Sequence, residues 1–101
     1  MVTVLVDKDK SKIKLLGHSG FDVVGRDIVC SAISSIVITS VNAILTFDEN
    51  YIEYINKKDE FIINVKTSNQ ITSNIITNML NLLKELEKDY PDNIKIKEEI
   101  Q

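Results

Sequence analysis

Two extended patterns open the chain. Valines at every second position of residues 2–6 are typical of a strand with one buried face. The charged run Lys8-Asp9-Lys10 is a turn signal, and residues 11–18 return in a second extended pattern. The first part of the chain is therefore predicted to be a β-hairpin whose second strand ends at His18.

A second hairpin is predicted near the middle of the chain, from Tyr51–Asn56 and Glu60–Lys66 around turn residues 57–59. Its second strand carries apolar side chains at positions 61, 63 and 65, which therefore share one face. Isoleucines at 94 and 96 indicate a short last strand. These patterns predict five strands in all.

The stretch Ile28–Phe47 contains twenty residues and no charge. At 100° per residue its polar positions fall on one narrow arc, and Ile, Val and Leu fill the rest; the arc consists of Ser31, Ser35, Thr39, Asn42 and Thr46. The stretch is long enough to cross a membrane, but its seven Ser, Thr and Asn residues oppose insertion. We therefore expect the central helix of a soluble domain, mostly covered and with one polar edge.

A second helix is predicted after the second hairpin, because apolar residues recur there at spacings of three and four; they are Ile71, Ile75, Met79, Leu82, Leu83 and Leu86. Ser68 or Asn69 can cap its start, and Tyr90-Pro91 ends it. The element order is then ββαββαβ. This order predicts one α+β domain over residues 1–101, a small, mostly antiparallel sheet with two helices packed on it.

Composition narrows the classes of function. The formal net charge of −3 and the scattering of lysines among acids argue against direct nucleic-acid binding. A single cysteine excludes an internal disulfide and fits a reducing cytoplasm. One His, one Cys and one nearby carboxylate fall short of the usual zinc ligand set, so we expect neither metal nor other cofactor. The N-terminus shows no signal-peptide pattern.

The residues that suggest chemistry are concentrated in one segment. All three glycines, the only histidine, the only cysteine and the only arginine lie between Gly17 and Cys30. A thiol and an imidazole are the two parts of cysteine nucleophilic catalysis. With Asp27 as helix cap, Cys30 takes the third helical position, where unpaired amides stabilise a thiolate and can bind an oxyanion. Ser34 follows one turn later on the same side.

His18 is expected at a strand end that faces this helix start, within reach of the sulfur. The loop between them contains glycines at both ends and can close over a substrate; its candidate substrate contacts are Ser19, Gly20, Phe21, Val23, Val24 and Gly25. Each residue alone also has an ordinary interpretation: a buried small hydrophobe for Cys30, a cap for Asp27, a packing residue for Ser34. Their combination favours chemistry.

The segment resembles the signature of the bacterial ribosomal-processing cysteine protease family, called Prp. The resemblance is carried by Gly17-His18, by an eight-residue loop with Gly25, and by the run from Asp27 through Cys30 to Ser34. It extends over nearly the whole chain in the order of hairpins and helices. Ser19 and Ser31 depart from the family pattern, where alanine is common.

The resemblance implies a cytoplasmic, homodimeric endopeptidase that removes the N-terminal extension of a large-subunit ribosomal protein after an aromatic residue. It places the catalytic base on His18 and the nucleophile on Cys30, with Gly17, Asp27 and Ser34 as supporting motif positions. Three alternatives stay open: a non-catalytic ribosome-assembly scaffold on the same fold, another thiol enzyme such as an acyltransferase, and a redox-sensing thiol.

Overall fold

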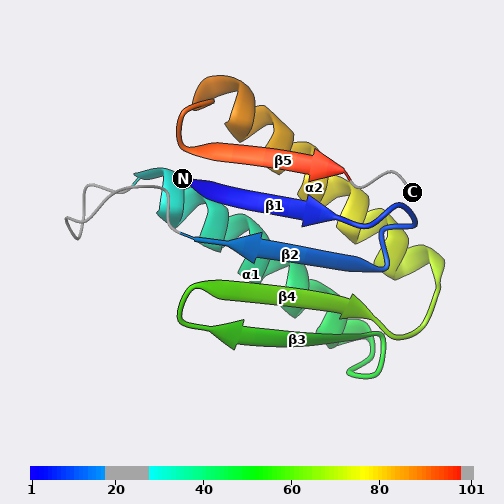
Figure 1. The fold of residues 1–101 in the computed structure, drawn as a ribbon. Helices are drawn as coiled ribbons and strands as arrows, with labels where there is room; N and C mark the ends of the chain where they lie inside the picture. The colour runs from blue at the N-terminus through cyan, green and yellow to red at the C-terminus, as the bar shows by residue number, and fades with distance from the viewer. Residues whose placement is uncertain (18–27, 99–101) are drawn as a thin grey trace.

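The protein folds as one layer of strands covered by one layer of helices, in a computed structural model that describes residues 1–17 and 28–98 (Figure 1). In chain order the elements are β1 (Val2–Val6), β2 (Lys12–Leu16), α1 (Ile28–Phe47), β3 (Ile52–Lys57), β4 (Glu60–Val65), α2 (Gln70–Asp89) and β5 (Ile94–Glu98). The predicted α+β class and the ββαββαβ order are confirmed.

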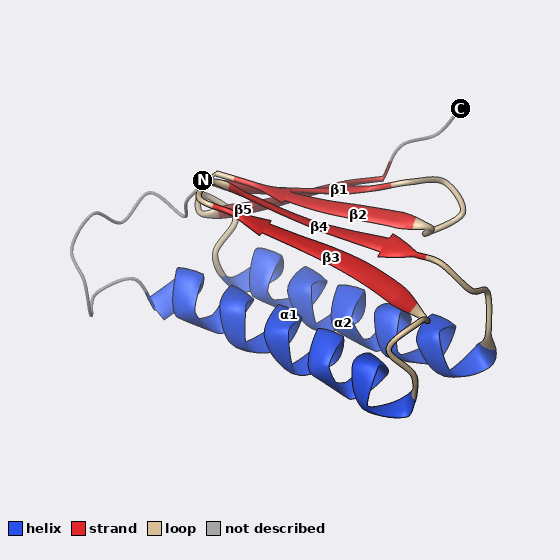
Figure 2. Cartoon of the chain, turned by 90° about the horizontal axis from the view of Figure 1, so that it is seen from below, coloured by secondary structure: helices blue, strands red, loops and turns tan. Residues whose placement is uncertain are grey.

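The five strands form one sheet in the order β3-β4-β2-β1-β5. All neighbouring strands are antiparallel except β1 and β5, because α2 carries the chain back across the sheet before β5 begins. Both helices cover the same face of the sheet, as Figure 2 shows from below. The opposite face carries no helix of the described part of the chain.

The core lies between the sheet and the two helices, where the alternating apolar positions of the strands meet the apolar faces of α1 and α2. Val4, Ile13, Ile63 and Ile94 are fully buried on neighbouring strands. The expected shared face of the second hairpin is also confirmed, since Phe61, Ile63 and Val65 all belong to this core or pack against it. Burial of this apolar surface is the main source of stability.

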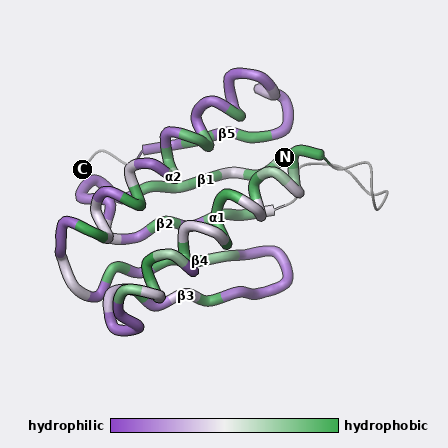
Figure 3. The backbone as a smooth tube through the Cα atoms, turned by 180° about the vertical axis from the view of Figure 1, so that it is seen from behind, coloured by the Kyte–Doolittle hydropathy of each residue, from purple (hydrophilic) through white to green (hydrophobic). Residues whose placement is uncertain are grey.

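Helix α1 has the length and hydropathy of a helix that is able to cross a membrane. In the fold its buried positions, Val29, Ile33, Val37, Ser40, Val41 and Ile44, face the sheet and α2. The predicted polar arc from Ser31 to Thr46 is exposed along its whole length. Figure 3 shows α1 mostly green and white, whereas α2 alternates between green and purple. The burial pattern is that of a helix packed on a core sheet.

Helix α2 begins as its sequence predicts. Asn69 is the N-cap, and its side-chain oxygen accepts a hydrogen bond from the Thr72 amide at 2.8 Å. Tyr90 is the C-cap, one residue before proline. Element boundaries differ slightly from the predictions: β2 ends at Leu16 rather than at His18, and the turn of the second hairpin is Lys58-Asp59 rather than residues 57–59.

The earlier end of β2 has a physical reason. Gly17 adopts φ +81°, outside the extended region, so the strand cannot continue through it. Lys57 stays in β3 because it pairs with Glu60 across the hairpin, which leaves two residues for the turn.

Candidate active site

Gly17 directs the chain out of β2. A Cβ atom at this position would lie 2.9 Å from the Met1 carbonyl oxygen, and the positive φ is one that L side chains rarely adopt. The Gly17 amide also donates a hydrogen bond to the Asp59 carbonyl in the β3–β4 turn at 2.9 Å. An L side chain is therefore strained at this position, and the chain leaves β2 from a backbone that is held by a hydrogen bond.

Cys30 is the third residue of α1, as predicted. It is partly exposed, whereas the preceding Val29 is fully buried in the core and anchors the first turn. The amides of a first helical turn have no intrahelical acceptor and concentrate partial positive charge. The helix thus holds the thiol beside amides that favour negative charge.

A groove of about 300 Å³ connects the end of β2, the start of α1 and the β3–β4 turn. Gly17, Cys30 and Ser34 all line it, so three of the five predicted motif residues are brought together. Its floor is apolar and includes Val2, Leu15 and Ile33, which belong to the core. Ser34 is exposed one turn after Cys30, as its spacing predicts.

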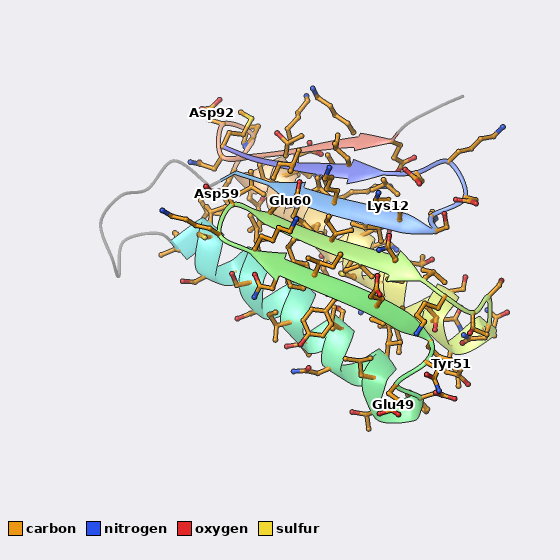
Figure 4. All side chains as sticks on the ribbon, turned by 60° about the horizontal axis from the view of Figure 1, so that its bottom comes forward. Lys12, Glu49, Tyr51, Asp59, Glu60 and Asp92 are labelled. Atoms are coloured by element: carbon orange, nitrogen blue, oxygen red, sulfur yellow. The ribbon has the colours of Figure 1, made fainter. Side chains whose placement is uncertain are left out.

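The opposite wall of the groove is the segment from Asn56 to Phe61, which the sequence interpretation did not assign to the site. Figure 4 shows its labelled members Asp59 and Glu60 at the end of the sheet where α1 begins. The missed signal is topological: this turn reaches the site only because β4 pairs with β2. The wall adds two lysines and two acids, and one aromatic ring, Phe61, which stacks on Tyr54 with ring centroids 5.7 Å apart.

The remaining predicted residues lie outside the described residues. They are His18, Ser19, Gly20, Phe21, Val23, Val24, Gly25 and Asp27. Figure 1 shows that β2 ends and α1 begins at the same end of the sheet. Within residues 1–17 and 28–98, no group of three His, Cys, Asp or Glu side chains is placed to hold a metal ion.

A larger hollow, of about 420 Å³, lies at the other end of the sheet, between the β1–β2 turn and the start of α2. Lys10, Lys66, Asn69 and Thr72 are among its lining residues. Its lining contains neither a thiol nor an imidazole, so we place the chemistry in the smaller groove around Cys30.

Arranged in this way, the groove can carry out acyl transfer to sulfur. It offers a partly exposed thiol, first-turn amides able to hold an oxyanion, and an apolar floor that can bind a side chain of the substrate. The only imidazole in the sequence belongs to His18, which directly follows Gly17 in the chain.

Comparison with known proteins agrees with this chemistry. Residues 1–95 match the family model described as cysteine protease Prp. The chain is 34% identical to the ribosomal processing cysteine protease Prp of two Staphylococcus aureus strains over 103 aligned positions, covering 95% of this chain and 97% of the relative.

Solved structures show the same similarity. The crystal structure of an essential ribosomal processing protease Prp from S. aureus, in complex with a covalently linked product peptide, aligns with a TM-score of 0.88 and 27% identity over 98% of this chain and all of that chain. A second structure of that protease, with a substrate peptide, aligns with a TM-score of 0.80 and 25% identity over 97% of each chain. On these grounds the chain belongs to the Prp family of ribosomal processing cysteine proteases.

Proposed function

We propose that this cysteine protease removes the N-terminal extension of a large-subunit ribosomal protein through a covalent thiol mechanism. The observation that carries the proposal is the placement of Cys30 in the first turn of α1, partly exposed and lining a groove with Gly17 and Ser34. His18 is the proposed general base, because it follows the residue that directs the chain out of β2.

The proposed reaction has two stages. The imidazole of His18 accepts the thiol proton, and Sγ of Cys30 attacks the scissile carbonyl carbon. The carbonyl oxygen becomes an oxyanion held by first-turn amides; the C–N bond then breaks, and the leaving amine takes the proton from the imidazolium. Water, deprotonated by the neutral imidazole, attacks the thioester carbonyl carbon. The C–S bond then breaks, the acid product leaves, and the imidazolium returns its proton to the Cys30 thiolate. A covalently linked product peptide in the S. aureus relative supports such an intermediate.

The proposed substrate residue on the acyl side is aromatic and occupies the groove between α1 and the β3–β4 turn. The apolar floor formed by Leu15 and Ile33 supports this assignment. Replacing that aromatic residue with alanine removes on the order of 2–3 kcal/mol of transfer free energy, which corresponds to roughly 30–150-fold in kcat/KM.

The supporting roles follow the motif. Asp27 is the proposed cap of α1, and Ser34 lines the groove with Cys30. The proposed substrate contacts of the loop are Ser19, Gly20, Phe21, Val23, Val24 and Gly25. Because asparagine also caps helices well, Asp27→Asn is expected to keep most of the stability and a good share of the activity. A collapse of activity at unchanged stability would instead place Asp27 in the chemistry.

The decisive experiment compares Cys30→Ala with Ser31→Ala on a peptide that contains the extension. Both changes are small, and Ser31 is the exposed neighbour on the same turn. We expect cleavage to disappear in the first variant only. Cleavage at the parental rate by Cys30→Ala would refute the thiol mechanism and favour the scaffold alternative.

A second measurement tests His18. We expect His18→Ala to change the pH dependence of Cys30 alkylation and to lower the cleavage rate by ~10²–10⁴-fold. An unchanged alkylation profile would remove His18 from the mechanism, and alkylation without any peptidase activity would favour a redox-sensing thiol.

We also propose that the protein acts in the cytoplasm as a homodimer. The outward side of α1 carries no charge and combines its exposed polar arc with Ile28, which is 58% exposed, so it is the proposed contact. Thr39 lies on this arc, nine residues beyond Cys30. Sedimentation of the parent and of Thr39→Lys tests the dimer; a monomeric parent at micromolar concentration would contradict it.

A further inference from the structure

The face of the sheet turned away from the helices has a chemistry of its own. It faces the viewer in Figure 1, and both helices lie behind it. Because side chains alternate along each strand, the strand positions that do not enter the core point to this open face. The pairing register lines these positions up across all five strands.

The open face gathers basic side chains that are dispersed in the sequence. Thr3 pairs with Lys95 and Leu5 with Lys97, while Lys14 pairs with Ile62. In all, its charged strand residues are the five lysines Lys12, Lys14, Lys57, Lys95 and Lys97 and the two glutamates Glu53 and Glu60. The face therefore has an excess of three positive charges.

The rest of the described chain has the opposite balance, with six lysines and ten acidic residues. The fold thus separates charge that is mixed along the sequence. On the open face the two acids are already engaged: Glu60 forms an ion pair with Lys14 at 3.3 Å, and Glu53 accepts a hydrogen bond from the Asn64 side chain at 3.3 Å. The charges of Lys12, Lys95 and Lys97 face solvent without a carboxylate partner among the described residues.

Apolar residues form a recessed floor beneath these lysines. Ile62 is only 9% exposed although no helix covers it, and Leu5, Leu16 and Ile55 are partly buried beside it. Long lysine side chains cover apolar surface with their methylene stems and keep the ammonium group in water. None of the exposed large apolar side chains of the described residues lies at a strand position of this face.

We propose that the open face of the sheet binds the phosphate backbone of RNA. The strands place these lysines on one face of the sheet, and ammonium groups neutralise phosphates without reading sequence. The stacked Tyr54 and Phe61 rings lie on the helix face, so the open face offers no stacking platform for bases. The proposal departs from the expectation drawn from net charge, since the fold collects the lysines on one face.

The recessed floor is the reason for choosing RNA over a lipid surface, because insertion into a membrane needs apolar side chains that protrude. The positive charge also opposes pairing of this face with itself in a second copy of the chain. Where the proposed function holds, the relevant RNA is that of the ribosomal particle on which the substrate sits, with the protease anchored through the face opposite its helices.

The experiment measures binding of the intact protein to a fluorescently labelled short RNA duplex at several salt concentrations. Lys95→Gln/Lys97→Gln removes two charges from the open face, and Lys84→Gln/Lys88→Gln removes two exposed charges from α2 as the matched control. For three to five phosphate contacts, parental affinity should fall about 40- to 500-fold between 50 and 200 mM salt. The affinity of Lys95→Gln/Lys97→Gln for the RNA should be about 10- to 60-fold below that of the parent near 0.1 M salt. The slope of the logarithm of affinity against the logarithm of salt concentration should be smaller by about 1.8.

Circular dichroism checks the folding of both variants. The single change Lys12→Gln on β2 should also lower the affinity for RNA, which tests the open face independently of β5. Absence of RNA binding by the parent at low salt, or equal losses in the β5 and α2 variants, would overturn the proposal. Binding to phosphatidylserine vesicles but not to RNA would overturn it in favour of a lipid surface. Binding to an acidic protein alone would do so in favour of a protein partner.

Cleavage of the free extension peptide separates this proposal from the proposed function. We expect Lys95→Gln/Lys97→Gln to cleave the free peptide like the parent and to lose rate only on substrate bound to ribosomal particles. A parent that binds RNA but cleaves no extension peptide would contradict the proposed function alone.

Discussion

Gly17 gives the sharpest test of how the fold positions the site. Replacing it with alanine introduces a Cβ atom 2.9 Å from the Met1 carbonyl oxygen at a residue with φ +81°. The left-handed conformation costs an L-residue about 1–2 kcal/mol. Relieving the contact by a bond-angle change of about 7° costs about 1 kcal/mol more. The lower entropy of the unfolded alanine chain offsets about 0.5–1 kcal/mol of this.

The net expectation for Gly17→Ala is a loss of about 1–2.5 kcal/mol in the free energy of unfolding, or roughly 4–20 °C in Tm for a domain of this size. Activity should fall further than stability. A backbone shift at Gly17 disturbs its hydrogen bond to Asp59 and the start of the path to His18, and displacement of a reacting group by 1 Å costs on the order of 100-fold. Thermal unfolding and peptide cleavage well below Tm measure the two effects.

Two controls make the test specific. Ile44→Val changes a fully buried side chain and should lower the free energy of unfolding by a similar ~0.5–1.5 kcal/mol. Because Ile44 lies fourteen residues beyond Cys30, about 21 Å along α1, this variant should keep its peptidase activity. D-alanine at position 17, introduced by ligation at Cys30, suits a positive φ and should keep Tm and activity near the parental values. Parental Tm and activity in L-Gly17→Ala would refute the reasoning.

Three further predictions concern α2. Thr72 is 1% exposed and its Oγ1 has no hydrogen-bond partner among the described residues, so Thr72→Val should raise Tm by about 4–8 °C; Thr46→Val, which removes a 2.7 Å bond to a carbonyl, should not. Asn69→Ala should lose about 1 kcal/mol of stability in urea titration, and Asn69→Asp should keep it. The hydrogen bond from Lys84 lowers the pKa of Glu98 below its ordinary value, so this pair stabilises the fold at neutral pH, and its contribution disappears as pH falls through that lowered pKa. In carboxyl NMR titrations, Lys84→Met should return the pKa of Glu98 toward the ordinary value. An unchanged titration would contradict the pairing.

Local pattern was sufficient for most of the fold. The period of two in β1 and the spacing of three and four in α2 reflect burial of one face, which each element must achieve wherever it packs. Helix α1 is rich in β-branched residues, and it was predicted from its length and its polar arc rather than from propensity. The boundary at Leu16 was missed because the positive φ of Gly17 goes with a hydrogen bond from its amide to the Asp59 carbonyl, which is distant in sequence.

The sequence by itself determined the class of fold, the order of the elements and the concentration of reactive groups between Gly17 and Cys30, because periodicity and residue type are local properties. Only the tertiary structure decided that the β3–β4 turn forms the opposite wall of the groove and that five lysines share the open face of the sheet. Both follow from which strands become neighbours and in which register. That choice depends on burying all the apolar faces at once, and no single segment of the chain contains it.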